Sequence, residues 1–170
     1  MNNSIGRAFW AVLVFLSAAG VAAAQSVERI DVLDSGLYNA VTTRTEAAPG
    51  TASGRTHVVD KVEFYARTNR VPARIGTRFG MRYVVVGSPQ DQNVGVRVVW
   101  KLPAPGLRNP KTGNVYRETN EDVTKTIGYR DSLTGYRFDD DWELVPGDWT
   151  LELWAGGRML ATRTYTVYRP

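Results

Sequence analysis

The stretch that decides the fold class is RFGMRYVVV, Arg78–Val86, in which apolar and polar residues alternate. Phe79, Met81 and Tyr83 occupy every second position, and they alternate with Arg78, Gly80 and Arg82. A period of two is typical of a β-strand that has one packed face and one solvated face. This stretch therefore predicts a half-buried strand.

The same alternation continues on both sides of this stretch. It is present in VVDKVEFYAR (Val58–Arg67) and in VGVRVVWK (Val94–Lys101). Between Asn39 and Arg55 the chain is rich in Thr, Ala, Gly and Pro, and we expect a flexible loop there. Seven to eight such strands in a chain of this length predict an all-β fold, an immunoglobulin-like antiparallel β-sandwich.

Turn signals separate the alternating runs at the spacing of an all-β domain. The segment GSPQDQN joins two of the runs, and NPKTGN (Asn109–Asn114) predicts a turn through its Pro and Gly. Pro146 and Gly147 precede another strand. Gly156 and Gly157 form the pair that a two-residue primed hairpin turn requires.

The N-terminal residues 1–24 have the pattern of a secretory signal peptide. Arg7 is followed by the apolar run Ala8–Ala19, and Ala22–Ala24 provides small residues for cleavage between Ala24 and Gln25. The apolar run is shorter than the ~20 residues of a membrane-spanning helix. We therefore expect export to the periplasm or the cell exterior, no transmembrane segment after cleavage, and a single domain over residues 25–170.

Composition excludes several classes of chemistry. The chain has no cysteine, which rules out thiolate zinc sites, iron–sulfur clusters and cysteine nucleophiles. Without Arg7, 20 basic and 17 acidic residues remain, and the basic residues are spread along the chain. Nucleic acid is therefore not an expected partner.

Three segments together resemble a bacterial domain-of-unknown-function family of small exported β-sandwich domains. They are ARIGTRFGMRY (Ala73–Tyr83), LPAPGLRNPKTG (Leu102–Gly113) and WELVPGDWTLELW (Trp142–Trp154). The string Trp-Glu-Leu-Val-Pro-Gly-x-Trp is the most specific part of a similarity that extends from about Ile30 to Val167. The resemblance implies an all-β fold and no assigned activity, and it carries no catalytic residues to transfer.

Three consecutive acids, Asp139–Asp141, interrupt the strand pattern between Phe138 and Trp142. In a regular strand Asp140 would share a packed face with these two aromatic residues, and a buried carboxylate without a partner is strongly unfavourable. We therefore expect the chain to bend or bulge near Asp140, with aspartate side chains bonded to nearby backbone N–H groups.

Two further interpretations of these acids stay open. Asp139 and Asp141 would lie about 6.6 Å apart along an extended chain, near enough to contribute to one Ca²⁺ shell, although the spacing of a dedicated calcium loop is absent. Glycoside hydrolysis would instead pair Asp140 with Glu143 or Glu152, and it needs the two acids to face each other across a cleft.

His57 is the only histidine of the chain, and it lies where the expected loop enters a strand, beside Arg55. Neither a G-x-S-x-G nor an H-E-x-x-H motif is present, and no phosphate-binding Gly-rich loop is found. We interpret His57 as a solvated loop residue. The sequence predicts no catalytic residue and no cofactor.

The aromatic and basic residues suggest a binding surface. Trp149 alternates with Leu151 and Leu153, so Trp154 falls on the opposite, solvated face near a hairpin turn. An exposed Trp can stack on a sugar ring or anchor a protein. Four basic residues on the polar faces of successive strands are candidates for a basic stripe that binds an anionic glycan or an acidic partner. They are Arg78, Arg82, Arg97 and Lys101.

Two functions are consistent with these patterns. The first is a non-catalytic binding or accessory module of the bacterial envelope, with a protein or an envelope polymer as its partner. The alternative is a small carboxylate- or Ca²⁺-dependent hydrolase or metal-binding module that uses the stretch Asp139–Glu143.

Overall fold

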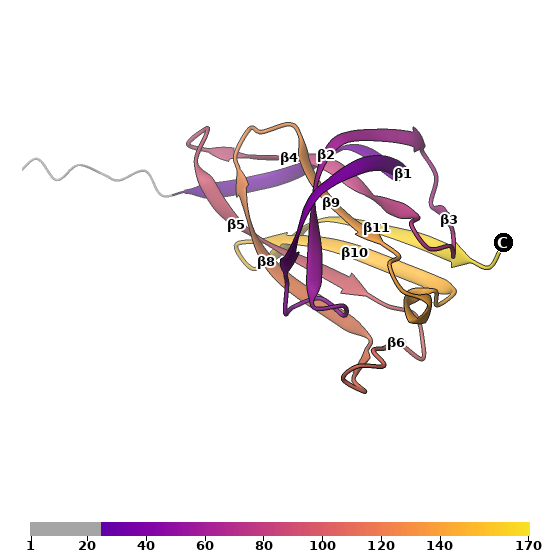
Figure 1. The fold of residues 1–170 in the computed structure, drawn as a ribbon. Coiled ribbons are helices and arrows are strands. Elements are labelled where there is room, and N and C mark those ends of the chain that lie inside the picture. The colour runs from indigo at the N-terminus through magenta and orange to yellow at the C-terminus, as the bar shows by residue number, and fades with distance from the viewer. Residues whose placement is uncertain (1–24) are drawn as a thin grey trace, which may run out of the picture.

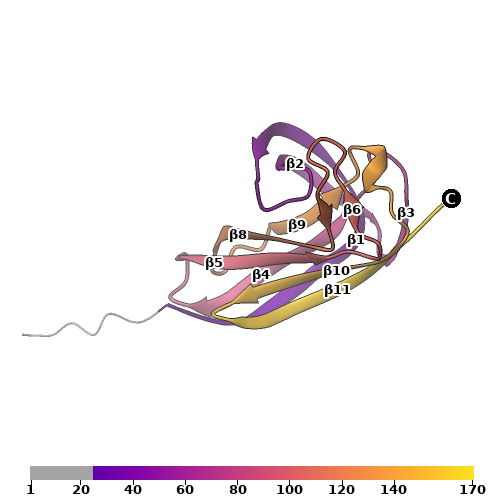
Figure 2. The ribbon, with the colours of Figure 1, turned by 90° about the horizontal axis from the view of Figure 1, so that it is seen from below.

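The computed structural model describes residues 25–170, which form two β-sheets packed face to face as a sandwich (Figures 1 and 2). The all-β sandwich predicted from the alternating pattern is confirmed. The predicted signal peptide, including Ala24, lies outside the described residues. In the described part of the chain, no helix is long and apolar enough to cross a membrane.

The strands divide between two main sheets and a small ribbon. The four-stranded sheet has the order β2 (Arg55–Ala66), β1 (Ser26–Ala47), β4 (Arg78–Ser88) and β9 (Ser132–Arg137). The five-stranded sheet has the order β3 (Arg70–Pro72), β11 (Arg158–Tyr168), β10 (Gly147–Ala155), β5 (Asn93–Lys101) and β8 (Glu118–Thr126). The ribbon pairs β6 (Leu107–Arg108) with β7 (Val115–Tyr116).

These eleven strands exceed the predicted seven to eight because β3, β6 and β7 are only two or three residues long. An alternation of polar and apolar residues cannot be recognised over so few positions. The remaining eight strands agree in number with the prediction.

A cluster of aromatic rings joins the two sheets. Phe79 of β4 is fully buried, and its ring centroid lies 5.1–6.1 Å from those of five other aromatic residues. Such tilted and edge-to-face contacts add stability beyond the area that they bury. The five neighbours of Phe79 come from both sheets and the segment after β9: Trp100, Tyr136, Phe138, Trp149 and Tyr165.

The predicted turns are confirmed where the structure tests them. Gly156 and Gly157 connect β10 to β11 with φ angles of 56° and 74°, the left-handed conformation of a primed hairpin turn. Within the turn Asn109–Asn114, the backbone N–H of Gly113 donates to the carbonyl of Asn109.

The prediction of a flexible loop over residues 39–55 is wrong for most of this segment. Strand β1 continues to Ala47 and β2 begins at Arg55, so only residues 48–54 lie outside strands. The first half of β1 pairs with β4 as far as Leu37, whereas its second half pairs only with β2. Residues 38–66 therefore form a two-stranded hairpin arm that leaves the four-stranded sheet (Figure 1). Thr-rich strands whose two faces are both largely solvated lack the clear alternation that identifies a strand.

Candidate functional site

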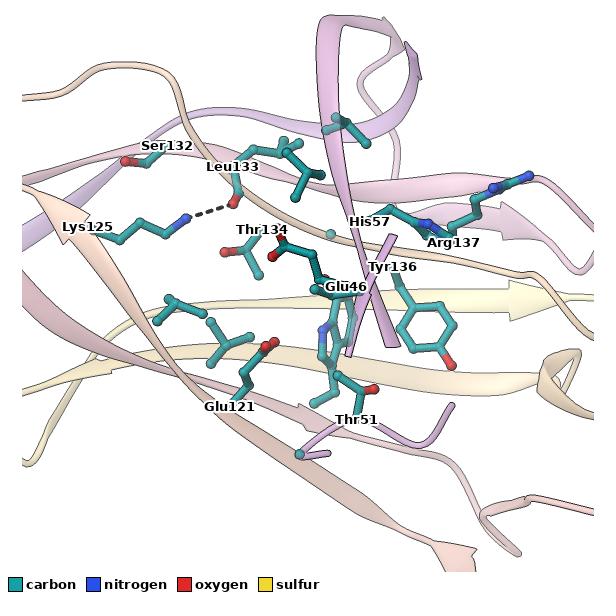
Figure 3. Close-up of a pocket in the computed structure, with 18 of the residues that line it drawn as sticks. Glu46, Thr51, His57, Glu121, Lys125, Ser132, Leu133, Thr134, Tyr136 and Arg137 are labelled. Atoms are coloured by element: carbon teal, nitrogen blue, oxygen red, sulfur yellow. Dashed lines mark hydrogen bonds between the residues drawn. The ribbon is translucent and has the colours of Figure 1, made fainter. Parts of the chain in front are cut away.

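The candidate site is a groove along the seam between the two sheets. Strands β8 and β9 are consecutive in the chain, yet each forms the edge of a different sheet. They meet at the connection over residues 127–131 and then separate. The space between them is a pocket of about 690 Å³, whose lining includes residues of β5, β8, β9 and the hairpin arm (Figure 3). We call it the seam groove.

The hairpin arm crosses the seam groove and is held on both sides of it. Ala52 at the tip is 1% exposed, and its carbonyl accepts a hydrogen bond of 2.9 Å from the Asn109 side chain. At Gly50 a Cβ would collide with the carbonyl oxygen of Asn120 on β8. Only glycine therefore permits the tip to lie so close to the edge of β8.

Strand β8 directs charged side chains toward the inside of the sandwich. Residues directly opposite each other in neighbouring strands share a face of the sheet. In the register with β5, Glu121 lies opposite the buried Val98, and Lys125 lies opposite the buried Val94. Both side chains therefore occupy positions that would be apolar in an ordinary sandwich.

Strand β9 places polar side chains opposite those of β8. Its register with β4 sets Ser132 against Tyr83 and Thr134 against Met81, and both partners are fully buried. The Thr134 hydroxyl lies 3.1 Å from that of Tyr83. The seam groove thus has polar groups on both strands, and its lining also includes the rings of Trp100 and Tyr136.

Lys125 and Glu121 are affected by their partial burial in the groove. Desolvation lowers the pKa of the Lys125 ammonium group, and the neighbouring Glu121 charge opposes this shift. Desolvation also raises the pKa of the Glu121 carboxyl group. The Lys125 Nζ atom donates to the carbonyl of Leu133 at 3.2 Å (Figure 3). It therefore connects the two strands near the point where they meet.

Ser132 is the least satisfied polar side chain of the groove. The residue is 3% exposed, and its hydroxyl oxygen is buried without a hydrogen-bond partner among residues 25–170. A buried hydroxyl without a partner costs about 1–3 kcal/mol relative to one that is bonded. Such a group is rare in native proteins, where a buried hydroxyl is nearly always bonded to the protein, a water or a ligand.

The three consecutive acids produce the predicted bend, but a different carboxylate stabilises it. Strand β9 ends at Arg137, and a single 3-10 turn, η1 (Asp141–Glu143), follows. Glu143 is 1% exposed, and its Oε2 atom accepts from the backbone N–H groups of Asp139 at 2.6 Å and Asp140 at 3.0 Å. Its Oε1 atom accepts from the Tyr136 hydroxyl at 2.8 Å. The pKa of Glu143 is raised because burial disfavours its charged form, and these hydrogen bonds only partly oppose that effect.

Asp139 is bound by two arginines and a histidine rather than directed to solvent. Its carboxylate lies 2.6 Å from His57 Nε2, 3.2 Å from Arg137 Nε and 3.6 Å from Arg55 Nε. Asp140 pairs with Arg55 at 2.7 Å. The predicted solvated loop position of His57 is therefore wrong, because this residue belongs to β2 and its side chain is only 16% exposed.

This arrangement does not favour the metal or hydrolase interpretations. In the described part of the chain, no group of three or more Asp, Glu, His or Cys residues is arranged to hold a metal ion. Glu143 is buried under Tyr136, and Glu152 pairs with Lys101 at 2.6 Å on the outer face of the five-stranded sheet. Asp140 therefore faces neither acid across a cleft, as paired catalytic carboxylates would require.

A hydrogen-bonded chain of hydroxyl, imidazole and carboxylate does occur at this end of the arm. The Thr45 hydroxyl lies 3.0 Å from His57 Nδ1, while Nε2 contacts Asp139. Because a carboxylate only accepts hydrogen bonds, Nε2 carries the proton. Thr45 and His57 are directly paired across β1 and β2. The contact of His57 with Asp139 therefore also attaches the hairpin arm to the segment that follows β9.

The predicted basic stripe is wrong. Arg78 and Arg82 belong to β4, whereas Arg97 and Lys101 belong to β5, and these consecutive strands lie in different sheets. The four side chains also have separate partners. Arg78 donates to Thr42, Arg82 to the Val62 carbonyl, Arg97 to Asp122 and Lys101 to Glu152.

Trp154 lies on the outer face of the five-stranded sheet, as the alternation predicts, while Trp149 is fully buried. The Trp154 side chain is half-buried, and its indole N–H donates to Glu152 at 2.9 Å. Trp154 lines a shallow depression with Arg97 and Lys101. This surface is separate from the seam groove.

Sequence reasoning missed the inward charges of β8, although the segment ETNEDVTKT carries a signal. Neither alternating set of positions in this strand is apolar throughout, because Glu121 and Lys125 flank Val123 on the inner face. A strand without an apolar face is typical of a sheet edge that borders water or a ligand.

Comparison with known proteins agrees with this fold. A family model described as "Domain of unknown function (DUF3859)" matches residues 26–167. The chain belongs to this family. The predicted resemblance to a domain-of-unknown-function family is therefore confirmed. No protein with a curated description matches this DUF3859 chain in sequence.

A solved structure shares the architecture of this DUF3859 domain. It is an immunoglobulin-like protein from Pseudomonas aeruginosa, with a TM-score of 0.55 and 24% sequence identity. The match covers 88% of this chain and 100% of the other. At this identity the similarity concerns the fold alone, and the immunoglobulin-like prediction is confirmed.

Proposed function

We propose that this DUF3859 protein is an exported, non-catalytic binding module of the bacterial envelope whose ligand occupies the seam groove. Its partner is a protein or an envelope polymer. One observation carries the proposal: the inward-facing positions of two facing edge strands hold polar and charged side chains around a pocket of about 690 Å³.

The charged positions have an energetic cost that a binding role explains. Ionised side chains at inner positions of a sandwich lose hydration, in agreement with the opposite pKa shifts of Lys125 and Glu121. Stability alone would favour apolar residues at these positions. Sites that depart from the rules of packing are characteristically functional sites. Inward charges also discourage edge-to-edge aggregation, but that role does not require a roofed pocket.

The non-catalytic part of the proposal rests on how the acidic residues are used. Asp139, Asp140 and Glu143 all have partners within the protein, and these partners hold the bend and the hairpin arm. A catalytic carboxylate must instead reach a substrate from a cleft. Export rests on the predicted signal peptide over residues 1–24.

Site-specific photo-crosslinking in native bacterial envelopes tests the ligand site. A photo-crosslinking phenylalanine replaces Glu121 inside the groove, and matched variants carry it at Trp154 or at the exposed Val41 of the arm. We expect a discrete protein or glycan adduct from position 121 only. Melting temperatures of the three variants verify that each one folds.

An adduct that forms only at position 154 would contradict the groove and favour the outer sheet face as the binding surface. The absence of any adduct at position 121 in a folded variant would overturn the proposed ligand site. Cleavage of the chain between Ala24 and Gln25, measured by mass spectrometry of the mature protein, tests export separately.

A further inference from the structure

The end of the seam groove where β8 and β9 meet combines a cation with an unpartnered hydroxyl. Figure 3 places Lys125 and Ser132 together at this end, whereas His57 and Tyr136 lie toward the other. Lys125 comes two residues before Ile127, which makes a bridge to Val85, and Ser132 is the first residue of β9. We call this end the apex of the groove.

The Lys125 ammonium group forms no ion pair within residues 25–170, although the charge of Glu121 on the same face of β8 acts on it. The one hydrogen bond that Lys125 donates among the described residues goes to the neutral carbonyl of Leu133. An ammonium group has three donors. The apex therefore offers a positive charge and free donors to a ligand.

The Ser132 hydroxyl gives a second, independent indication of a ligand. It is buried in the pocket lining without a partner among the described residues, and it can donate to an anionic oxygen. A lysine and a hydroxyl at one closed end are suited to a carboxylate, because hydrogen bonds to a charged acceptor are about twice as strong as neutral ones.

The backbone of β9 favours a peptide as the bearer of that carboxylate. The Leu133 carbonyl reaches Lys125 and therefore points away from β4, while the Phe138 N–H points to Thr77 on the opposite side. By this alternation the backbone groups of Gly135 and Arg137 are also directed away from β4. An extended peptide matches such an edge, since its own N–H and C=O groups repeat at the same spacing.

Glu121 adds a preference further along the groove. It shares the inner face of β8 with Lys125, four residues away, which is about 13 Å in an extended strand. A peptide whose terminal carboxylate lies at Lys125 would present its fourth residue from the end near Glu121. A basic side chain there would be complementary in charge.

We propose, on the basis of the binding function above, that the seam groove binds the free C-terminus of an extended peptide, with the terminal carboxylate held by Lys125 and Ser132. The chain of the peptide follows the edge of β9 beneath the hairpin arm. Its side chains contact the aromatic and aliphatic lining of the groove.

Competitive capture of peptides tests this inference. Immobilised residues 25–170 are incubated with two random-sequence octapeptide pools, one ending in a free carboxylate and the other in a mass-tagged carboxamide. Mass spectrometry measures the enrichment of each pool. We expect at least about tenfold preference for the free acid, since one charge-assisted hydrogen bond accounts for a factor of that size. Basic residues should be enriched at the fourth position from the end.

Two variants and one control make the test specific. Lys125→Met should abolish the preference for the free acid. Ser132→Ala should weaken it several-fold without lowering the melting temperature, because this hydroxyl has no bond to lose. Lys111→Met, at an exposed turn position, should leave the preference unchanged.

Equal capture of the two pools would overturn carboxylate recognition while leaving peptide binding intact. If neither pool binds but position 121 still forms a glycan adduct in envelopes, the peptide inference fails and the proposed binding function stands. If neither pool binds and position 121 forms no adduct, both fail.

Discussion

Single residues of the seam groove show a cost in stability that the proposed binding role would explain. Lys125 is an inward-facing cation whose pKa is lowered mainly by desolvation. A base with a lowered pKa holds its proton less tightly in the folded state than in the unfolded state, where the value is 10.5. Stability therefore rises with pH between the folded pKa and 10.5, and the cost of Lys125 is largest at neutral pH.

Lys125→Met should remove this cost. We expect the free energy of unfolding to increase by up to about 1 kcal/mol at pH 7, because an apolar chain of similar length replaces a desolvated ammonium group. The gain should shrink as the pH approaches 10.5. Urea unfolding of both proteins at pH 7, 9 and 10 measures the difference. A gain that stays constant over this range would show that the Lys125 charge is not desolvated in the folded protein.

Glu143 is the opposite case, a buried acid whose loss should be strongly destabilising. Glu143→Ala leaves two backbone N–H groups and the Tyr136 hydroxyl without their acceptor. We expect a loss of about 3 kcal/mol or more, given roughly 1–3 kcal/mol for each buried group left unsatisfied. Chemical denaturation measures it, with Glu63→Ala at an exposed position of β2 as the control. Equal effects of the two substitutions would contradict the structural role of Glu143.

At the scale of elements, the hairpin arm determines whether the seam groove has a roof. Most of its residues are exposed or half-buried, and its attachment depends on a few specific contacts at the tip and near Arg55 and His57. Elements with little buried apolar surface open at a lower free energy than the core does. We therefore expect the arm to open more readily than the core, as entry of the proposed ligand would require.

Asp139→Asn should loosen the arm without unfolding the sandwich. The substitution removes the charge that His57, Arg55 and Arg137 share. We expect faster hydrogen–deuterium exchange over residues 45–58 and unchanged exchange over residues 147–168, where β10 and β11 lie in the core sheet. Asp131→Asn, at a carboxylate that is 68% exposed, is the matched control. A uniform increase along the chain would mean that Asp139 supports the whole fold rather than the arm.

At the scale of the whole molecule, the groove exists because two consecutive strands enter different sheets. The aromatic cluster around Phe79 fills the centre of the sandwich, and the sheets remain apart along the seam between β8 and β9. A closed barrel would pair these two edges and remove the groove. The open seam therefore provides both a polar pocket and a free strand edge.

The amino-acid sequence by itself determined the strands with a clear alternation, the main turns and the family of this protein. Alternation in Arg78–Val86 and the glycine pair at 156–157 depend on neighbouring residues, so each can be recognised locally. The bend at Asp140 also followed from the sequence, since a regular strand would have buried a carboxylate.

Only the tertiary structure decided which distant residues meet. His57 and Asp139 are 82 positions apart, and their contact depends on the direction in which the arm leaves the sheet. The basic stripe failed for a related reason, because the sequence does not specify whether β4 and β5 enter the same sheet. Strand pattern is a property of adjacent residues, whereas a groove between two sheet edges depends on how the whole chain packs.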